Sequence, residues 1–114
     1  MSVLLISADL MTSSKVAPAC AAAGLSCVTA LNGATAADGL SPTTRWVLVD
    51  LSAPGLRPAE LVAAVRASTA PAARIVAFGP HVHEAALAAA VAAGCDTVCS
   101  RGEFFARLPQ LLAS

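Results

Sequence analysis

The sequence predicts an α/β fold with a five-stranded parallel sheet in the strand order 2-1-3-4-5 and helices on both faces. Short apolar runs alternate five times with alanine-rich helical stretches along the chain. The runs at 3–7 and 45–50 are apolar at consecutive positions, as in strands that are buried on both faces, whereas the run at 26–31 alternates weakly. Each strand-helix unit takes about 20 to 25 residues, the length of a right-handed crossover unit in a parallel sheet.

The 114 residues predict a single domain over 1–114. Hydrophobic residues make up 57% and charged residues 12%, a composition that excludes a disordered chain. Seven basic and seven acidic residues cancel, which argues against nucleic-acid binding and against a polybasic membrane patch. No segment approaches the roughly 20 apolar residues of a membrane span, and no basic segment starts a signal peptide. We therefore expect a soluble, cytoplasmic protein.

The first half of the chain is expected to hold three strands, at 3–7, 26–31 and 45–50, and two helices, at 12–23 and 34–38. The strand at 45–50 is the clearest, because four apolar residues run directly into an acid. Thr12, Ser13 and Ser14 are candidate N-caps of the first helix. Pro18 fits that helix only within its first turn or at a kink.

The second half predicts helices at 59–67 and 82–93, strands at 74–78 and 96–100, and a last helix after Ser100. In the helix at 82–93, Val82, Leu87 and Val91 lie nearly in line, which predicts its buried face. Ser100 and Glu103 have the spacing of a capping box for the last helix. Pro109 is expected to kink or split that helix.

The four cysteines indicate structural roles in a reducing compartment. Cys95 and Cys99 lie four apart in a predicted strand, about 13 Å from each other and beyond disulfide reach. No pair has the C-x-x-C spacing of a zinc or redox site. The chain also lacks the glycine-rich nucleotide-binding motifs and the G-x-S-x-G elbow. We therefore do not expect an enzyme.

Polar residues follow several of the predicted strands at their carboxyl ends. Asp9 follows the first strand, Asp50 ends the third, and Arg101 follows the fifth. Ligands of open α/β sheets bind at this edge, where the strand order reverses. Two carboxylates there could hold Mg²⁺, and Asp50 could act as a nucleophile toward phosphoryl groups.

His81 and His83 stand two residues apart in the loop after the fourth strand. Together with Asp9 and Asp50 they are weak candidate ligands for Zn²⁺ or another transition metal. Alternate residues of a loop commonly point apart, so exposed histidines with an N-cap role are the favoured interpretation. Glu84 fits a first-turn helix-dipole partner better than a ligand.

Over essentially its full length, the chain resembles the receiver domains of two-component response regulators, which have the flavodoxin-like fold. The resemblance lies in the segments 4–9 (LLISAD), 47–55 (VLVDLSAPG) and 93–101 (AGCDTVCSR). The aspartate followed by proline and glycine in the second segment is the most specific part. The resemblance implies that Asp50 occupies the phosphoacceptor position and that Asp9 is one of the family's pair of metal-binding acids.

Other positions depart from the family's pattern. Ala8 stands where the second acid of the pair is expected, and Gly79 replaces the Ser or Thr after the fourth strand. Arg101 and Gly102 replace the Lys-Pro pair, which keeps the charge but changes its shape. Val98 takes the position of the aromatic switch residue. With Ala8 in place of an acid, we expect Mg²⁺ binding to be weak or absent.

Each candidate residue also has a purely structural interpretation. Asp50 could accept hydrogen bonds from backbone N–H groups of the loop at 51–55. Asp9 could cap the first helix. Arg101 could either lie in solvent or pair with Asp50.

These observations predict a degenerate receiver-like domain, a pseudo-receiver, that acts in signalling by binding a protein partner without phosphorylation. One alternative is a working single-domain response regulator phosphorylated on Asp50. A second alternative is a small metal-binding α/β protein that uses Asp9, Asp50, His81 and His83.

The helix at 82–93 is apolar on nearly all sides, with seven alanines beside its three larger residues. One side covers the sheet, so an apolar side faces water, and such surfaces mark interfaces. We therefore expect a homodimer through the face made by this helix, the fifth strand and the last helix. Ala88 and Ala92 are the expected contact residues, and receivers commonly dimerise through this region.

Overall fold

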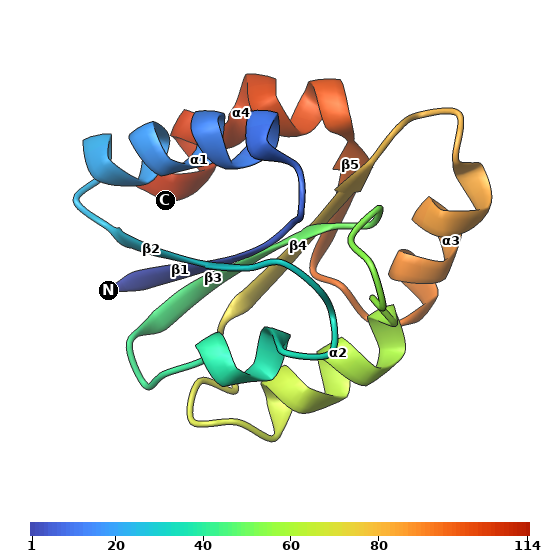
Figure 1. Ribbon diagram of the computed structural model, residues 1–114, viewed down its shortest axis with the longest axis horizontal. Helices are drawn as coiled ribbons and strands as arrows, with labels where there is room; N and C mark the ends of the chain where they lie inside the picture. Colours follow the sequence, from blue (N-terminus) through green and yellow to red (C-terminus); the bar gives the residue numbers. More distant parts are fainter.

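Five parallel strands form one sheet in the order β2-β1-β3-β4-β5, which confirms the predicted fold (Figure 1). The computed structural model describes residues 1–114. The elements are β1 (Ser2–Ile6), α1 (Leu10–Ala22), β2 (Ser26–Ala30), the 3₁₀ helix η1 (Ala36–Gly39), β3 (Thr44–Asp50), α2 (Pro58–Arg66), β4 (Arg74–Gly79), α3 (Glu84–Ala92), β5 (Thr97–Ser100) and α4 (Arg101–Ala113).

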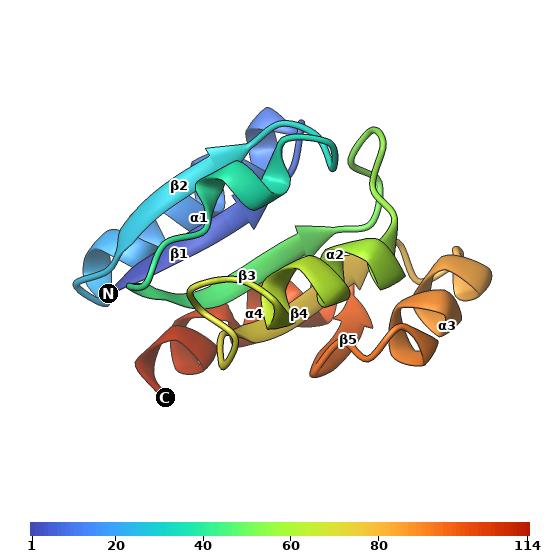
Figure 2. The same cartoon turned by 90° about the horizontal axis from the view of Figure 1, so that it is seen from below.

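Two hydrophobic clusters lie on opposite faces of the sheet, because successive strand side chains point to opposite sides. Leu4 and Ile6 of β1 belong to the cluster that packs against η1, α2 and α3. Val3 and Leu5 belong to the cluster under α1 and α4. Figures 1 and 2 show these two helical layers on either side of the sheet.

The central strands β1, β3 and β4 are almost completely buried, whereas β2 and β5 form the exposed edges of the sheet. The three central strands are the ones with continuous apolar runs, as strands covered on both faces require. The polar groups of the central layer therefore lie at the ends of its strands.

Helix α1 begins at Leu10, two residues earlier than predicted. The Asp9 side chain accepts the Met11 N–H at 3.3 Å and is the N-cap, so the candidate caps Thr12, Ser13 and Ser14 were wrong. The alternative role of Asp9 as the cap of this helix is confirmed. Pro18 lies inside α1, rather than in its first turn.

The region after β2 differs from the predicted helix at 34–38. It forms a bend and then the short 3₁₀ helix η1. The Asn32 side chain accepts the Thr35 N–H at 2.9 Å, and such a side-chain turn competes with a helical start.

Helix α3 begins at Glu84, because residues 81 and 82 form a turn before it. Its predicted buried face was wrong: Val82 is 68% exposed and Val91 is 63% exposed, whereas Ala90 is fully buried. Val82 precedes the helix, so helical spacing does not align it with Leu87. The small Ala90 side chain lets the helix approach the sheet closely.

Helix α4 begins with the predicted capping box between Ser100 and Glu103. It continues through Pro109 as one helix, so the expected split was wrong. Phe104, Leu108 and Leu112 lie on both sides of the proline and pack into the same cluster. This shared burial holds the two halves together in spite of the lost backbone hydrogen bond.

All four cysteines are free thiols. Burial raises the pKa of the Cys20 thiol to about 12, and the neighbouring Cys27 thiol adds to this increase. Cys20 lies in the cluster under α1 and α4, which fits the structural role predicted for it. No helix of the structure is long and apolar enough to cross a membrane.

The loop after β2 packs tightly on the loop after β3 at Gly33. The Gly33 N–H donates to the Pro54 carbonyl at 2.8 Å, and a Cβ added at Gly33 would lie 2.4 Å from the Gly55 carbonyl oxygen. We predict that Gly33→Ala lowers the free energy of unfolding by about 1 to 3 kcal/mol through overpacking. Chemical denaturation measures the change.

The matched control is Gly102→Ala, because nothing lies within 4 Å of a Cβ added at Gly102. Its first-turn helical position predicts unchanged or slightly increased stability. Equal effects of the two substitutions would contradict the close approach of the loops.

Candidate functional site

The carboxyl ends of four strands bring the predicted site residues to one edge of the sheet (Figure 1). Asp50 is the last residue of β3, and Asp9 lies between β1 and α1. Gly79 ends β4, and Arg101 is the first residue of α4 directly after β5. The parallel order therefore gathers residues that are up to 92 positions apart.

Asp50 is buried, with 2% of its surface exposed. Its carboxylate accepts the Ser7 hydroxyl at 2.7 Å and the Ser52 N–H at 2.9 Å. The bond from the Ser52 N–H is the loop interaction that was predicted as the structural role of Asp50. Ser7 was not predicted, although its place between the apolar strand and Asp9 pointed to the same edge.

Asp9 accepts hydrogen bonds from three groups. The Thr12 hydroxyl donates at 2.7 Å, the Met11 N–H donates at 3.3 Å, and the Arg101 guanidinium forms an ion pair with it. The Thr12 hydroxyl, followed by Arg101 and Met11, lowers the pKa of the Asp9 carboxyl below its ordinary value, against a smaller opposing effect of burial. Asp9 thus has its charge balanced within the chain.

Arg101 pairs with Asp9 and not with Asp50, and it is not left in solvent, so both alternatives considered for it were wrong. Its guanidinium also donates to the Thr12 hydroxyl at 2.6 Å and lies 5.6 Å from the centre of the Phe105 ring. Lys15 lies over the same ring at 4.7 Å. Thr12 was predicted as a helix cap, and its contact with Arg101 could not be read from local spacing.

Ser7 connects the Asp50 carboxylate to the backbone of Asp9. Its hydroxyl donates to Asp50 and accepts the Asp9 backbone N–H at 3.1 Å. A single buried hydroxyl therefore fixes the backbone of Asp9 relative to the side chain of Asp50. We refer to Ser7, Asp9, Thr12, Asp50 and Arg101 as the carboxylate network.

The remaining family positions add no polar group to this network. Ala8 is exposed, and Gly79 is buried. A Cβ added at Gly79 would have its nearest contact at 3.5 Å, with Leu51, so a small side chain fits there. Val98 is half-buried and packs against the cluster under α2 and α3.

The network does not provide the ligand set of a divalent cation. Mg²⁺ prefers several free oxygen ligands in octahedral geometry, whereas Asp9 is engaged by a guanidinium and Asp50 by a hydroxyl and an N–H. Nowhere do three His, Cys, Asp or Glu side chains come together as a possible metal site. His81 and His83 are both exposed, and His83 is the N-cap residue of α3 without a side-chain cap bond.

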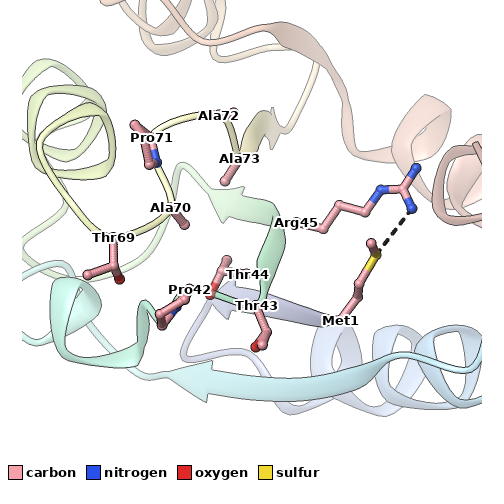
Figure 3. Close-up of a pocket in the computed structure, with 10 residues that line it drawn as sticks. All are labelled: Met1, Pro42, Thr43, Thr44, Arg45, Thr69, Ala70, Pro71, Ala72 and Ala73. Carbon is pink, nitrogen blue, oxygen red and sulfur yellow. Dashed lines mark hydrogen bonds between the residues drawn. The ribbon is translucent and has the colours of Figure 1, made fainter.

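A cavity of about 540 Å³ lies at the opposite end of the sheet (Figure 3). It is formed by the turn before β3 and the loop before β4, and its lining includes Thr43, Thr69 and Pro71. Arg45 points toward the Met1 sulfur, at 3.4 Å. None of the predicted site residues lines this cavity.

Solved receiver domains share this structure. One of them is the receiver domain of a sensor histidine kinase from Pseudomonas aeruginosa PAO1, which is described with a magnesium ion coordinated in its active site cleft. It superposes with a TM-score of 0.78 at 17% sequence identity, and the match covers 97% of this chain and 93% of that one. The chemotaxis response regulator CheY4 of Vibrio cholerae superposes with a TM-score of 0.75 at 19% sequence identity, and the match covers 97% of each chain. The receiver domain of NtrX from Brucella abortus superposes with a TM-score of 0.75 at 17% sequence identity, and the match covers 96% of this chain and 92% of that one.

The chain has the receiver fold. No family model matches the sequence, and no curated protein matches it. At this level of identity the receiver-like chain shares the backbone arrangement with these proteins, so its function is argued from its own residues.

The bond between Ser7 and Asp50 is testable by a double-mutant cycle. We predict that Ser7→Ala and Asp50→Ala each lower the free energy of unfolding by about 1 to 3 kcal/mol, because each leaves a buried partner unpaired. The coupling energy of the pair should be about 1 to 3 kcal/mol. Denaturant unfolding of the four proteins measures it.

The control pair is Ser14→Ala with Asp50→Ala. Ser14 is exposed and donates to the Met11 carbonyl, so its effect should add to that of Asp50. Additive effects of Ser7 and Asp50 would contradict the bond.

Proposed function

We propose that this receiver-like chain is a non-enzymatic, cytoplasmic signalling module that binds a protein partner without phosphorylation of Asp50. The observation that carries the proposal is the burial of Asp50: the carboxylate is 2% exposed, and both of its oxygens accept hydrogen bonds from the chain itself. Phosphoryl transfer needs an accessible nucleophile with charge stabilisation around the transferred group.

The surroundings of Asp50 support the same conclusion. Gly79 offers no hydroxyl to a phosphoryl oxygen, and Ala8 offers no second metal-binding acid. Arg101 carries a positive charge, but it is paired with Asp9. The alternative of a phosphorylated single-domain regulator rests on the retained Asp9 and Asp50, and the metal-binding alternative has no cluster of ligands.

Incubation with acetyl phosphate and Mg²⁺, followed by intact mass measurement, tests the proposal. We expect no added phosphoryl group on the wild-type chain. The comparison variant Ala8→Asp/Gly79→Ser/Arg101→Lys supplies the groups that the family pattern places around the aspartate, and Gly79→Ser fits because the nearest contact is 3.5 Å.

Modification of the triple variant alone would identify these substitutions as the cause of the lost reactivity. A phosphoryl group on the wild-type chain that disappears in Asp50→Asn would overturn the proposal in favour of the phosphorylated regulator.

The partner surface of the proposal is the outer side of α3. Ala88 and Ala92 are exposed there, and Val91 between them is 63% exposed. A cavity of about 530 Å³ continues this apolar side toward the start of α2. Small side chains let a partner backbone approach closely, and exposed apolar patches of this kind are uncommon on monomers. We propose that a second copy of the chain binds this surface.

Sedimentation of Ala88→Glu/Ala92→Glu checks the dimer. We expect a dimeric wild-type protein and a monomeric variant with unchanged helical content, because two charges would be buried at the interface without partners. The matched control, Ala17→Glu/Ala21→Glu, places the same charges at the same spacing on exposed positions of α1 and should remain dimeric. A wild-type protein that is monomeric at high micromolar concentration would rule out this interface.

A further inference from the structure

The guanidinium of Arg101 is held from three directions. It pairs with the Asp9 carboxylate, donates to the Thr12 hydroxyl at 2.6 Å, and lies against the Phe105 ring. Phe105 is itself in edge contact with Phe104, with 5.3 Å between ring centres. The side chain is therefore preorganised, although it is 33% exposed, and this distinguishes it from a mobile surface arginine.

Arg101 is the cation that the chain itself brings to the carboxylate network. Magnesium is coordinated in the active site cleft of the Pseudomonas receiver domain, and a divalent ion there would interact with carboxylates at the strand ends. In the present chain Asp9 is the carboxylate that follows β1, and its partner is a guanidinium supplied from α4. An ion at the Asp9 oxygen that Arg101 contacts would compete with the guanidinium for that oxygen.

We propose that Arg101 is the resident cation of the carboxylate network and takes over the charge-balancing role of a divalent metal ion. The inference rests on the proposed function, because a pocket whose Asp9 is paired with a cation of the same chain needs neither metal nor phosphorylation to present a constant surface. Asp9 caps α1 and Arg101 begins α4, so the same ion pair also connects the starts of these two helices.

Both hydrogen bonds of the guanidinium come from one terminal nitrogen, Nη2, which donates to the Asp9 carboxylate and to the Thr12 hydroxyl. The Thr12 hydroxyl itself donates to Asp9, so the two acceptors are already joined where the cation binds. The guanidinium carbon also lies at a cation–π distance from the Phe105 ring. Because this cation belongs to the chain, the pocket does not lose it when divalent ions are scarce.

Removal of the resident cation should turn the network into a divalent-cation site. We expect Arg101→Gln to bind Mn²⁺ at least about tenfold more tightly than the wild-type chain, since Asp9 then lacks its cationic partner and the positive charge that repels the ion is gone. Electron paramagnetic resonance of free Mn²⁺ measures the binding. Mn²⁺ is the probe because it accepts the same carboxylate and water ligands as Mg²⁺.

Two further variants make the result specific. Arg107→Gln removes the same charge from an exposed position of α4, where Arg107 lies 3.9 Å from Glu103, and it should bind Mn²⁺ no better than the wild-type chain. Asp9→Asn/Arg101→Gln removes both partners and should lose the gained affinity.

Equal Mn²⁺ affinity of Arg101→Gln and the wild-type chain would overturn the proposal, as would binding that survives in the double variant. If Arg101→Gln does not fold by itself, refolding with and without millimolar Mn²⁺ decides the question. Folded protein only with the ion supports the proposal, and failure in both conditions contradicts it. A failure of the proposed function instead shows as a phosphoryl group on Asp50, which is a separate measurement.

Discussion

Burial of the central strands on both faces is the constraint from which the rest of the structure follows. β1, β3 and β4 lie between two helical layers and are almost completely inaccessible, so a polar side chain inside the sheet would lose its hydration without compensation. Two of the four buried polar residues, Ser7 and Asp50, stand at the carboxyl ends of strands and bond to each other. The location of the candidate site is thus a consequence of the packing.

Asp9 takes part in a helix cap and in an ion pair with the same side chain. It caps α1, fixes the start of that helix at Leu10, and pairs with Arg101 at the start of α4. The two helices cover the same face of the sheet. The geometry of the carboxylate network therefore depends on how both helices begin, and the electrostatic balance of the pocket is part of the stability of the fold.

Alanine shapes the outer surface as much as the core. The chain has 28 alanines, and in α3 one of them, Ala90, occupies the contact with the sheet. The larger Val91 is left on the outer side. A helix of this composition has no polar face to turn toward solvent. The side that allows the closest approach to the sheet therefore becomes the buried side. The exposed apolar side is the result.

Local patterns of the sequence determined most of the elements: the five strands, the capping box of α4, and the position of Asp50 at the end of a buried strand. The strand order was implied by the resemblance to receiver domains and not by a local pattern. Apolar runs and caps act over a few residues and can be read without the fold. The pairing of Arg101 with Asp9 and Thr12, the bond between Ser7 and Asp50, and the rotation of α3 were decided by the tertiary structure. The side-chain bonds join residues 43 to 92 positions apart, and the rotation of α3 depends on how closely the helix approaches the sheet. Neither can be predicted from the spacing of residues along the chain.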